Sequence, residues 1–351
     1  MHLTDVLKTS PYPGKSAELI SLGDGLNFST PLAAVGGTVV PNELFFLRSN
    51  YPPPTIKPEA WRMCIEGRVQ RPLKLSLGEL QSLPSHTEEV WLECAGNSRR
   101  RFNPKGEGNQ WDEQAVSNAV FKGVSLSIVL DHVGPLNDAI EVVATGADSG
   151  DFQRSLPLDV ALRPEVLLAW EMNGEPIPAP NGGPVRLVVP SWAGIASVKW
   201  PVRLDLVNAP FRGYYHVERY VIVDESGRTL RTVREMPVKS VIAWPAEGQV
   251  VARGAHTVFG FAWSGLGQIS QVEVSTDGQR TWAAARLVPG EGPLAWRRWE
   301  FHWNASDVGP ATIAARATDT AGNVQPTSVP WNKFGYLMNA ITSRDVTVQG
   351  A

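Results

Sequence analysis

The last third of the chain constrains the fold most, because it is a series of short segments in which apolar and polar residues alternate. Such segments, separated by turn residues, lie at 241–251, 256–265, 271–288, 294–304, 311–323 and 341–348. Alternation with a period of two places one face of a strand in a core, and Asp277-Gly278 is a hairpin signal. The pattern predicts an immunoglobulin-like β-sandwich over residues 236–351, a module that usually has a structural or interfacial role.

The preceding part of the chain, residues 1–235, mixes irregular, helical and extended patterns. Prolines are frequent between residues 31 and 54 and indicate packed loops rather than long helices. Ser76 and Glu79 have the spacing of a capping box at the start of a short helix, and Asn173-Gly174 joins two strands in a hairpin. The strands do not alternate regularly with helices, so the sequence predicts an α+β domain.

Composition and charge narrow the class of partner. With 351 residues, of which 43% are hydrophobic and 19% charged, the chain can bury a large core, and its length suggests two domains. A net charge of -3 gives no general reason to bind nucleic acid or an anionic membrane. No apolar run is long enough to span a membrane. The first residues lack an export signal, so we expect a cytoplasmic protein, or a periplasmic one if a signal has been removed.

One of the two cysteines stands in an unusual setting. Cys94 ends a predicted strand in the segment VWLECAGNSRRRF, residues 90–102, and three arginines follow it within seven positions. A local positive field favours the thiolate form of a cysteine, so this segment indicates a functional site. We expect Arg100 and Arg101 to be solvated or paired in salt bridges.

The common catalytic motifs are missing from the sequence. It contains no GxGxxG, no P-loop and no GxSxG, and its histidines are scattered singly without HExxH. These absences argue against dinucleotide, P-loop, α/β-hydrolase and histidine-based zinc sites, and nothing suggests a histidine base for a cysteine protease. Cys64 alternates with apolar residues along a predicted strand and is interpreted as a packed core thiol.

The Cys94 segment is one of five segments whose order along the chain is informative. The segments FFLRSN (45–50), WLECAGNSRR (91–100), GADSGD (146–151), NGGPVRLVVP (181–190) and GIASVKW (194–200) occur in this order. Together they resemble the sulfite oxidase family of molybdenum enzymes, and DTAGNVQP and WNKFGY in the predicted sandwich resemble that family's dimerisation domain. The resemblance covers essentially the whole chain. It implies a sulfite oxidase-type mixed α/β molybdopterin-binding domain followed by an immunoglobulin-like domain, and a homodimer.

The resemblance also implies a cofactor and the residues that hold it. The cofactor is molybdenum-molybdopterin, in which Cys94 supplies one soft sulfur ligand beside the two dithiolene sulfurs of the pterin. Arg186, Ser197 and Lys199 correspond to residues at the phosphate end of the pterin. The implied cofactor-binding set is Phe45, Phe46, Asn50, Asp148, Ser149, Asn181, Arg186, Ser197 and Lys199. For any one of these, an ordinary loop or strand role is the alternative.

The implied reaction is the oxidation of sulfite to sulfate. Arg48 and Arg99 match the family's anion-binding arginines, which position the substrate and offset its charge. Trp111 matches its pocket-wall tryptophan, and Tyr220 matches its tyrosine near the metal. The sequence has no CxxCH haem signature, so we expect no haem in this chain and an external electron acceptor, such as a c-type cytochrome.

The sequence departs from the family pattern at two places. Arg48-Ser49-Asn50 stands where Arg-Asn-His is common, and Phe334 stands where a further arginine is expected, with Lys333 beside it. The loss of a cation weakens anion binding, which leaves three alternatives to sulfite. In the first, the enzyme oxidises another sulfur compound, such as a sulfane-carrying protein thiol. In the second, it reduces an S-oxide or N-oxide. In the third, the protein is a non-catalytic module that binds an anion.

Overall fold

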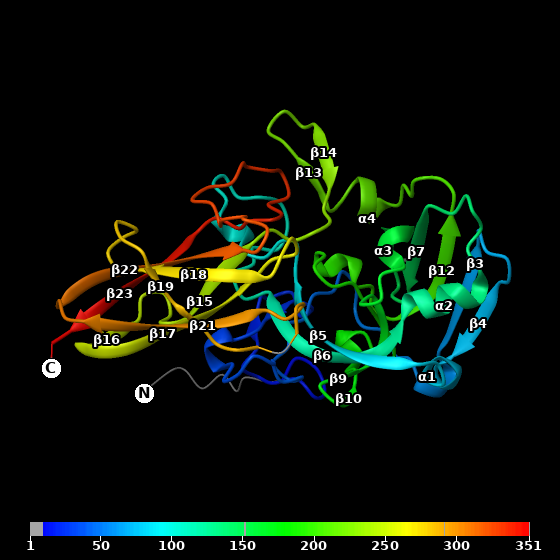
Figure 1. The fold of residues 1–351 in the computed structure, drawn as a ribbon, viewed down its shortest axis with the longest axis horizontal. Coiled ribbons are helices and arrows are strands. Elements are labelled where there is room, and N and C mark those ends of the chain that lie inside the picture. Colours follow the sequence, from blue (N-terminus) through cyan, green and yellow to red (C-terminus); the bar gives the residue numbers. More distant parts are fainter. Residues whose placement is uncertain (1–9, 151, 291, 351) are drawn as a thin grey trace.

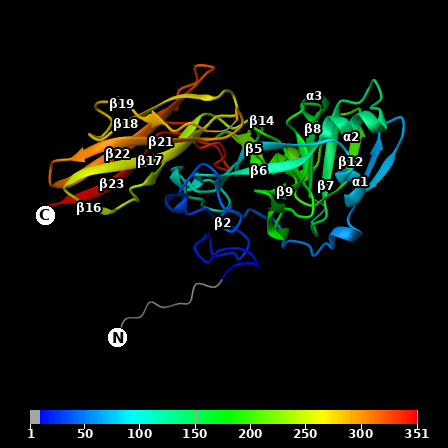
Figure 2. The ribbon, with the colours of Figure 1, turned by 60° about the horizontal axis from the view of Figure 1, so that its bottom comes forward.

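The chain forms a region of mixed sheets and short helices followed by a β-sandwich, as the computed structural model in Figure 1 shows. The structure describes residues 10–150, 152–290 and 292–350. Figure 2, turned by 60°, keeps the sandwich at one end of the molecule and β3, β7 and β12 near the other. Within these described ranges the α-helices are α1 (Leu77–Gln81), α2 (Leu126–Val133), α3 (Leu158–Ala161) and α4 (Tyr214–Val217).

In the described part of the first region, the strands form two five-stranded sheets and two short two-stranded pairs. One sheet has the order β10-β9-β6-β5, with β11 paired to β9, and the other has the order β4-β3-β12-β7-β8. The pairs are β1 with β2 and β13 with β14. The strands are β1 (Ile20–Ser21), β2 (Phe28–Ser29), β3 (Arg62–Gly67), β4 (Leu73–Ser76), β5 (Ser85–Glu93), β6 (Val116–Ser125), β7 (Glu141–Gly146), β8 (Gln153–Pro157), β9 (Leu167–Met172), β10 (Glu175–Pro176), β11 (Arg186–Val188), β12 (Pro201–Val207), β13 (Val221–Val223) and β14 (Thr229–Thr232).

Apolar side chains from both sheets share one core. Met63 of β3, Leu168 of β9, Leu204 of β12 and Leu130 of α2 are fully buried in the same cluster. Burying a side chain of this size stabilises the fold by about 1.5–3 kcal/mol. The core therefore fixes the two sheets against each other and makes the ends of their strands a rigid base for loops.

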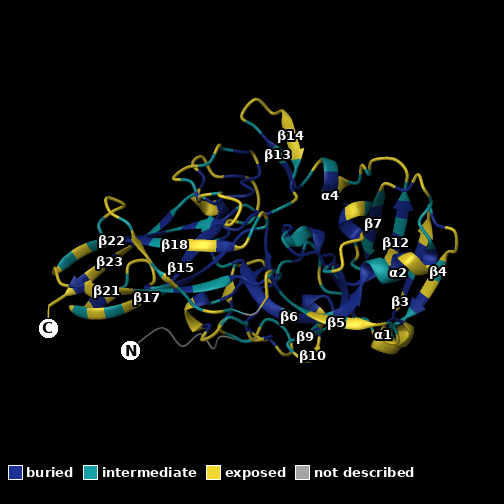
Figure 3. Ribbon diagram, in the orientation of Figure 1, coloured by how far each residue is buried: buried dark blue, intermediate teal, exposed yellow. Residues whose placement is uncertain are grey.

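The sandwich packs a four-stranded sheet, ordered β15-β17-β21-β20, on a five-stranded sheet ordered β16-β23-β22-β18-β19. Buried and exposed residues alternate along strands such as β23, as Figure 3 shows. Its strands are β15 (Lys239–Trp244), β16 (Val250–Ala252), β17 (Gly254–Trp263), β18 (Ile269–Ser275), β19 (Ala283–Ala284), β20 (Arg286–Leu287), β21 (Arg297–Ala305), β22 (Gly309–Asp319) and β23 (Thr342–Gln349). The predicted fold class, α+β followed by an immunoglobulin-like sandwich, is confirmed.

An aromatic core joins the sandwich to the first region. Trp91 of β5 contacts Trp263 of β17, with ring centroids 6.2 Å apart, and Phe261 stacks on Trp296 at 4.1 Å. These residues belong to the same buried cluster as Cys94. Because large aromatic side chains contribute most to core and interface energetics, the sandwich supports the strand end that carries this cysteine.

Local predictions are confirmed at several elements and wrong at one residue. Ser76 and Glu79 form the predicted capping box of α1. Asn173 and Gly174 have positive φ angles, as a type I′ turn requires, between β9 and β10. Cys64 is only half-buried because Met63 and Ile65 take the core face of β3, so its interpretation as a core thiol is wrong.

Two predictions concern an export signal at the start of the chain and a membrane-spanning segment. Residues 1–9, which belong to the segment in which the sequence shows no export signal, lie outside the described residues. In the described part of the chain, every helix is too short or too polar to cross a membrane.

Candidate active site

Cys94 lies directly after the last residue of β5, in a tight turn held by a buried side chain. The Cys94 amide donates to the Ala115 carbonyl at 2.9 Å, and the Cys94 carbonyl accepts from the amide of Asn97 at 2.8 Å. The Asn97 side chain donates to Glu93 Oε1 at 2.8 Å and accepts from the amide of Ala115 at 3.0 Å. The Asn of the CAGN segment therefore ties the turn to β5 and to the residue before β6.

The sandwich reaches this turn through a buried ion pair. The Glu93 carboxylate accepts from Lys239 Nζ at 2.9 Å and from Trp263 Nε1 at 2.7 Å, and all three side chains are buried. Removing one member of such a pair leaves an uncompensated charge and costs about 3–5 kcal/mol. The first strand of the sandwich thus fixes the residue next to Cys94.

Two cavities meet at Cys94. We call the first the inner cavity; it has an empty volume of about 680 Å³, and Arg186, Ser197 and Lys199 are among the residues that line it. The second, the outer cavity, has an empty volume of about 850 Å³, and the half-exposed residues Tyr214 and Arg219 are among those that line it. Both cavities are lined by Arg48, Asn50, Cys94 and Tyr220. A thiol at this junction can contact one group held in the inner cavity and another that enters through the outer cavity.

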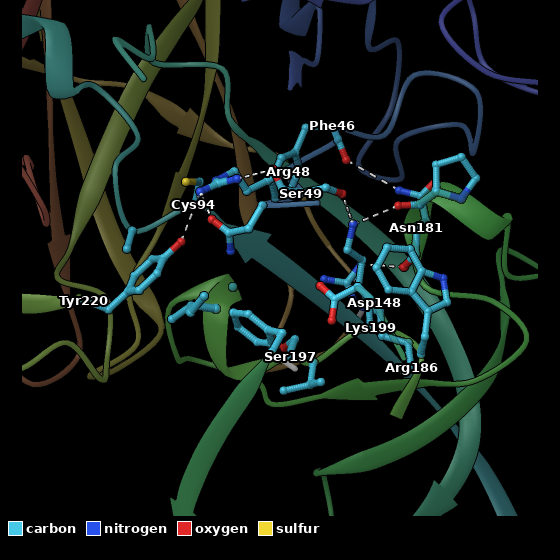
Figure 4. A pocket seen from close by; sticks show the side chains of 18 residues that line it. Phe46, Arg48, Ser49, Cys94, Asp148, Asn181, Arg186, Ser197, Lys199 and Tyr220 are labelled. Carbon is cyan, nitrogen blue, oxygen red and sulfur yellow. Dashed lines mark hydrogen bonds between the residues drawn. The ribbon is translucent and has the colours of Figure 1, made fainter. Parts of the chain in front are cut away.

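Arg48 forms hydrogen bonds to two of the residues that line both cavities. Its Nη2 donates to Asn50 Oδ1 at 2.6 Å and to the Tyr220 hydroxyl oxygen at 3.3 Å, and Figure 4 shows it beside Cys94. Burial tends to lower the pKa of Arg48, but Tyr220 and Cys94 outweigh burial, so its pKa is raised. Arg48 is therefore a fixed positive charge next to the thiol.

Two cations, buried Arg186 and half-buried Lys199, lie at the far end of the inner cavity. Figure 4 shows Asp148, Lys199 and Arg186 there, away from Cys94. Lys199 Nζ donates to Ser49 Oγ at 2.5 Å and to the Pro180 carbonyl at 3.0 Å. Burial, followed by the charges of Arg186 and Arg48, holds the pKa of Lys199 well below its usual value. Burial also lowers the pKa of Arg186 to about 9.

This end of the cavity fits an anionic ligand. Arg186 Nη1 donates to the Asn181 carbonyl at 2.8 Å, but its buried Nε has no hydrogen-bond partner among residues 10–150, 152–290 and 292–350. A buried donor without a partner costs about 1–3 kcal/mol, more when it is charged. A phosphate would supply the missing acceptor and offset the excess of positive charge.

Other residues of the predicted cofactor set lie at or near the inner cavity. Ser197 lines it and accepts from the amide of Val189 at 3.0 Å. Asn181 and Phe46 also line it, and Asn181 Nδ2 donates to the Phe46 carbonyl at 3.5 Å. The Phe45 carbonyl is already used by another donor, Lys15 Nζ, at 2.8 Å.

Three predicted residues, Phe45, Ser149 and Trp111, do not line either cavity, as the described residues define them. Ser149 is exposed to solvent, and Trp111 is fully buried in the cluster that contains Cys94. The Nε1 of Trp111 has no hydrogen-bond partner in the described ranges. The predicted roles of Phe45, Ser149 and Trp111 stay predictions.

Arg99 lines the outer cavity within a cage of glycines. Its Nε donates to the Phe334 carbonyl at 2.6 Å and its Nη1 to the Asn109 carbonyl at 2.8 Å. A Cβ atom at Gly96 would lie 2.4 Å from Arg99 Nη2, and one at Gly335, which has a positive φ angle, would lie 2.6 Å from Arg99 Cγ. The glycines are needed because the guanidinium occupies the space of their missing side chains.

The neighbouring arginines behave as predicted. Arg101 Nε forms an ion pair with Glu113 Oε1, and Arg100 Nη2 lies 3.7 Å from Glu113 Oε2. Burial tends to raise the pKa of Glu113, but Arg344 and Arg101 outweigh it and lower that pKa to about 2. Arg100 and Arg101 thus serve a salt-bridge network rather than the cavity.

Sequence reasoning missed several residues in or beside the cavities, and Lys15, Tyr336 and Arg219 are the most informative of them. Lys15 is buried against Asn181 Oδ1 at 3.2 Å, from an irregular segment that carries no recognisable signal. Tyr336 stacks on Tyr220, with ring centroids 5.1 Å apart, and lies under the Arg99 guanidinium. Arg219 also lines the outer cavity, and its position directly before Tyr220 is a signal that could have found it.

Metal ligation by protein side chains alone has no support in the described residues. No group of three or more His, Cys, Asp or Glu residues in ranges 10–150, 152–290 and 292–350 could hold a metal ion. Cys94 is the thiol at the cavity junction.

Two protein-family models match this chain. The oxidoreductase molybdopterin binding domain matches residues 50–215, and the Mo-co oxidoreductase dimerisation domain matches residues 230–348. The two models thus cover the two structural regions in the same order.

Curated proteins and a solved structure agree with these models. The chain is 38% identical to sulfite oxidase of Gallus gallus, over 86% of this chain and 72% of the relative, and 35% identical to mitochondrial sulfite oxidase of Mus musculus. It spans 60% of the mouse protein. The structure of the sulfane dehydrogenase SoxCD from Paracoccus pantotrophus matches with a TM-score of 0.84 and 28% identity, over 99% of this chain and 90% of that one. The chain therefore belongs to the sulfite oxidase family of molybdopterin-dependent oxidoreductases.

Proposed function

We propose that this protein oxidises sulfite to sulfate, with a molybdenum-molybdopterin cofactor in the inner cavity and Cys94 as the protein ligand of the metal. The observation that carries the proposal is the position of Cys94, between a buried cationic cavity and an arginine-lined cavity that reaches solvent-exposed residues. The first cavity suits a permanently bound anion, and the second suits an anion that enters and leaves.

The inner cavity residues fit the cofactor. Arg186 and Lys199 would hold the phosphate, because buried Arg186 has an unpartnered donor within the described residues and half-buried Lys199 lines the same cavity. Asn181, Asp148 and the Phe46 backbone would line the pterin, since they border the same cavity. When bound, the cofactor supplies two-electron oxygen-atom transfer, and a thiolate suits a soft metal site.

Arg48 and Arg99 would bind sulfite through charge-assisted hydrogen bonds and offset its charge beside Cys94. Arg48 donates to the Tyr220 oxygen, which leaves the Tyr220 hydroxyl proton available for the substrate. In balance, sulfite and water give sulfate, protons and an electron pair, and the electrons pass to an external acceptor.

The proposal extends to partners and domain limits. We propose a c-type cytochrome as acceptor and a homodimer formed through the sandwich, which is supported by the match to a dimerisation domain. We place the boundary between the two domains at residues 235/236, close to the start of β15 at Lys239.

Sulfite-dependent reduction of ferricyanide and of cytochrome c tests this function. The sample must first be shown to contain close to one molybdenum per chain, and Arg99→Ala serves as the variant. We expect turnover by the parent protein and at least a ten-fold rise in the sulfite KM of the variant, the effect of losing a charge-assisted hydrogen bond. No sulfite turnover by a metal-loaded sample would refute the proposal.

A second candidate is the oxidation of sulfane sulfur on a carrier thiol. It is favoured by the similarity to the sulfane dehydrogenase structure and by Phe334, which removes a cation that a small sulfur oxyanion would use. A small-molecule hydropersulfide, compared with sulfite as the electron donor for ferricyanide, separates the two. A higher kcat/KM for the hydropersulfide would select the sulfane reaction.

A further inference from the structure

Arg219 brings a cation into the outer cavity that the sequence motifs do not assign. It follows α4 and directly precedes Tyr220, whose backbone has a left-handed φ of 55°. Non-glycine residues rarely adopt this conformation, and it recurs at functional sites. Arg219 lines the outer cavity together with Arg48, Arg99 and Cys94.

The guanidinium of Arg219 is held in place from three sides. Its Nε donates to the Tyr214 hydroxyl at 3.0 Å, its Nη1 lies 3.6 Å from Glu107 Oε2, and its Cζ lies 4.8 Å from the centroid of the Phe334 ring. Its Nη2 donates no hydrogen bond within the described residues. The side chain is thus ordered while one nitrogen stays available to a ligand.

Phe334 explains why a cation is found at this place. It occupies the position where the family motif has an arginine, and its backbone carbonyl holds Arg99 Nε. Its ring lies 5.8 Å from the Tyr336 ring, which in turn lies under Arg99 at 5.1 Å. An aromatic pair therefore separates two guanidinium groups, Arg99 on one side and Arg219 on the other.

We propose that Arg219 positions the anionic substrate and takes the place of the arginine that Phe334 replaces. The charge would be supplied from the segment before Tyr220 instead of from the segment that follows the sandwich strand β22. The inference rests on the proposed function in that the outer cavity is taken as the entry of a sulfur oxyanion. It restores a third cation to the cavity and keeps sulfite as a suitable ligand despite the departure in the motif.

Arg219→Ala in the molybdenum-loaded protein tests the proposal by kinetics and by binding. We expect the sulfite KM to rise about ten-fold while kcat changes less than about two-fold, because a positioning charge acts on binding. Sulfate binding, measured by calorimetry, should weaken by a similar factor, and Arg219→Lys should recover part of both losses. Arg228→Ala is the control, since it removes the same charge from a side chain that is 75% exposed and outside the cavity.

A double variant that moves the positive charge to position 334 sharpens the test. Phe334→Arg in the Arg219→Ala background should recover part of the sulfite and sulfate affinity if either position serves the same anion. Unchanged sulfite KM and sulfate affinity in Arg219→Ala, or equal losses in Arg228→Ala, would overturn the inference.

The outcome can be separated from that of the proposed function. If the parent protein does not turn over sulfite, the sulfate measurement still decides whether Arg219 binds the anion. If the parent turns over sulfite and Arg219→Ala behaves like the parent, only the role of Arg219 is wrong.

Discussion

The inner and outer cavities contain the same kinds of cation in opposite environments. In the inner cavity, Arg186 is buried and Lys199 is half-buried, and desolvation is the largest cause that lowers the pKa of each. In the outer cavity, Arg219 is 39% exposed, with Glu107 beside it. Two cations set against the carboxylate of Asp148 leave an excess of positive charge in the inner cavity, which indicates an anionic ligand that stays bound. Exposed and partly paired charge suits a ligand that exchanges.

The largest effect is expected at Arg186, where a substitution should raise the stability of the cofactor-free protein and weaken cofactor binding. Arg186→Met removes a buried charge and a donor that has no partner in the described residues. We expect the cofactor-free protein to become more stable by about 1 kcal/mol or more. The pterin should bind about 100-fold more weakly, because a charged hydrogen-bond donor is lost.

Thermal unfolding of cofactor-free protein and the pterin content of purified protein measure these two quantities. Arg231→Met, an exposed arginine on β14, is the control. A less stable cofactor-free Arg186→Met protein with normal pterin content would show that the inner cavity is an ordinary structural site.

A smaller effect should be confined to the outer cavity. Gly96→Ala places a methyl group against the Arg99 guanidinium, which has to move. We expect the sulfite KM to rise about ten-fold with pterin content unchanged. Gly36→Ala is the matched control, because a Cβ atom there meets no atom within 4 Å. Loss of pterin in Gly96→Ala would contradict the separation of the two cavities.

The last effect bears on the stability of the cofactor-free protein and not on ligand binding, through its pH dependence. Burial lowers the pKa of Lys15 from 10.5 to about 7. Between these values the unfolded chain binds more protons than the folded chain, so the free energy of unfolding should rise with pH across this window. For the cofactor-free protein we expect a rise on the order of a few kcal/mol, measured by denaturant unfolding at several pH values. Lys15→Met should flatten the curve; an unchanged curve would contradict the burial of a charged Lys15.

The sequence could predict what depends on short local spacing. The alternation after residue 236, the capping box of α1 and the setting of Cys94 are all contained in single segments, and the structure has the corresponding elements. Arg48 and Tyr220 were reached only through the family resemblance, because they come from segments 172 positions apart.

The remaining features depend on long-range packing. Cys64 and its neighbours alternate as a strand should, but the choice of core face depends on which sheet covers β3. The sequence gives no sign that Lys15 reaches Asn181, 166 positions away. Position 334 holds phenylalanine in place of the expected arginine, and we propose that Arg219 supplies the missing charge. This is likewise visible only when the two segments are packed together, with the Arg219 guanidinium on the Phe334 ring.

The most direct test of the account is the molybdenum and pterin content and sulfite turnover of Cys94→Ser, with Cys64→Ser as the control. Both variants lose one thiol, but only Cys94 borders the two cavities. We predict that Cys94→Ser loses sulfite turnover by at least about 100-fold and holds molybdenum poorly, while Cys64→Ser matches the parent. Full molybdenum content and full turnover in Cys94→Ser would contradict the central claim.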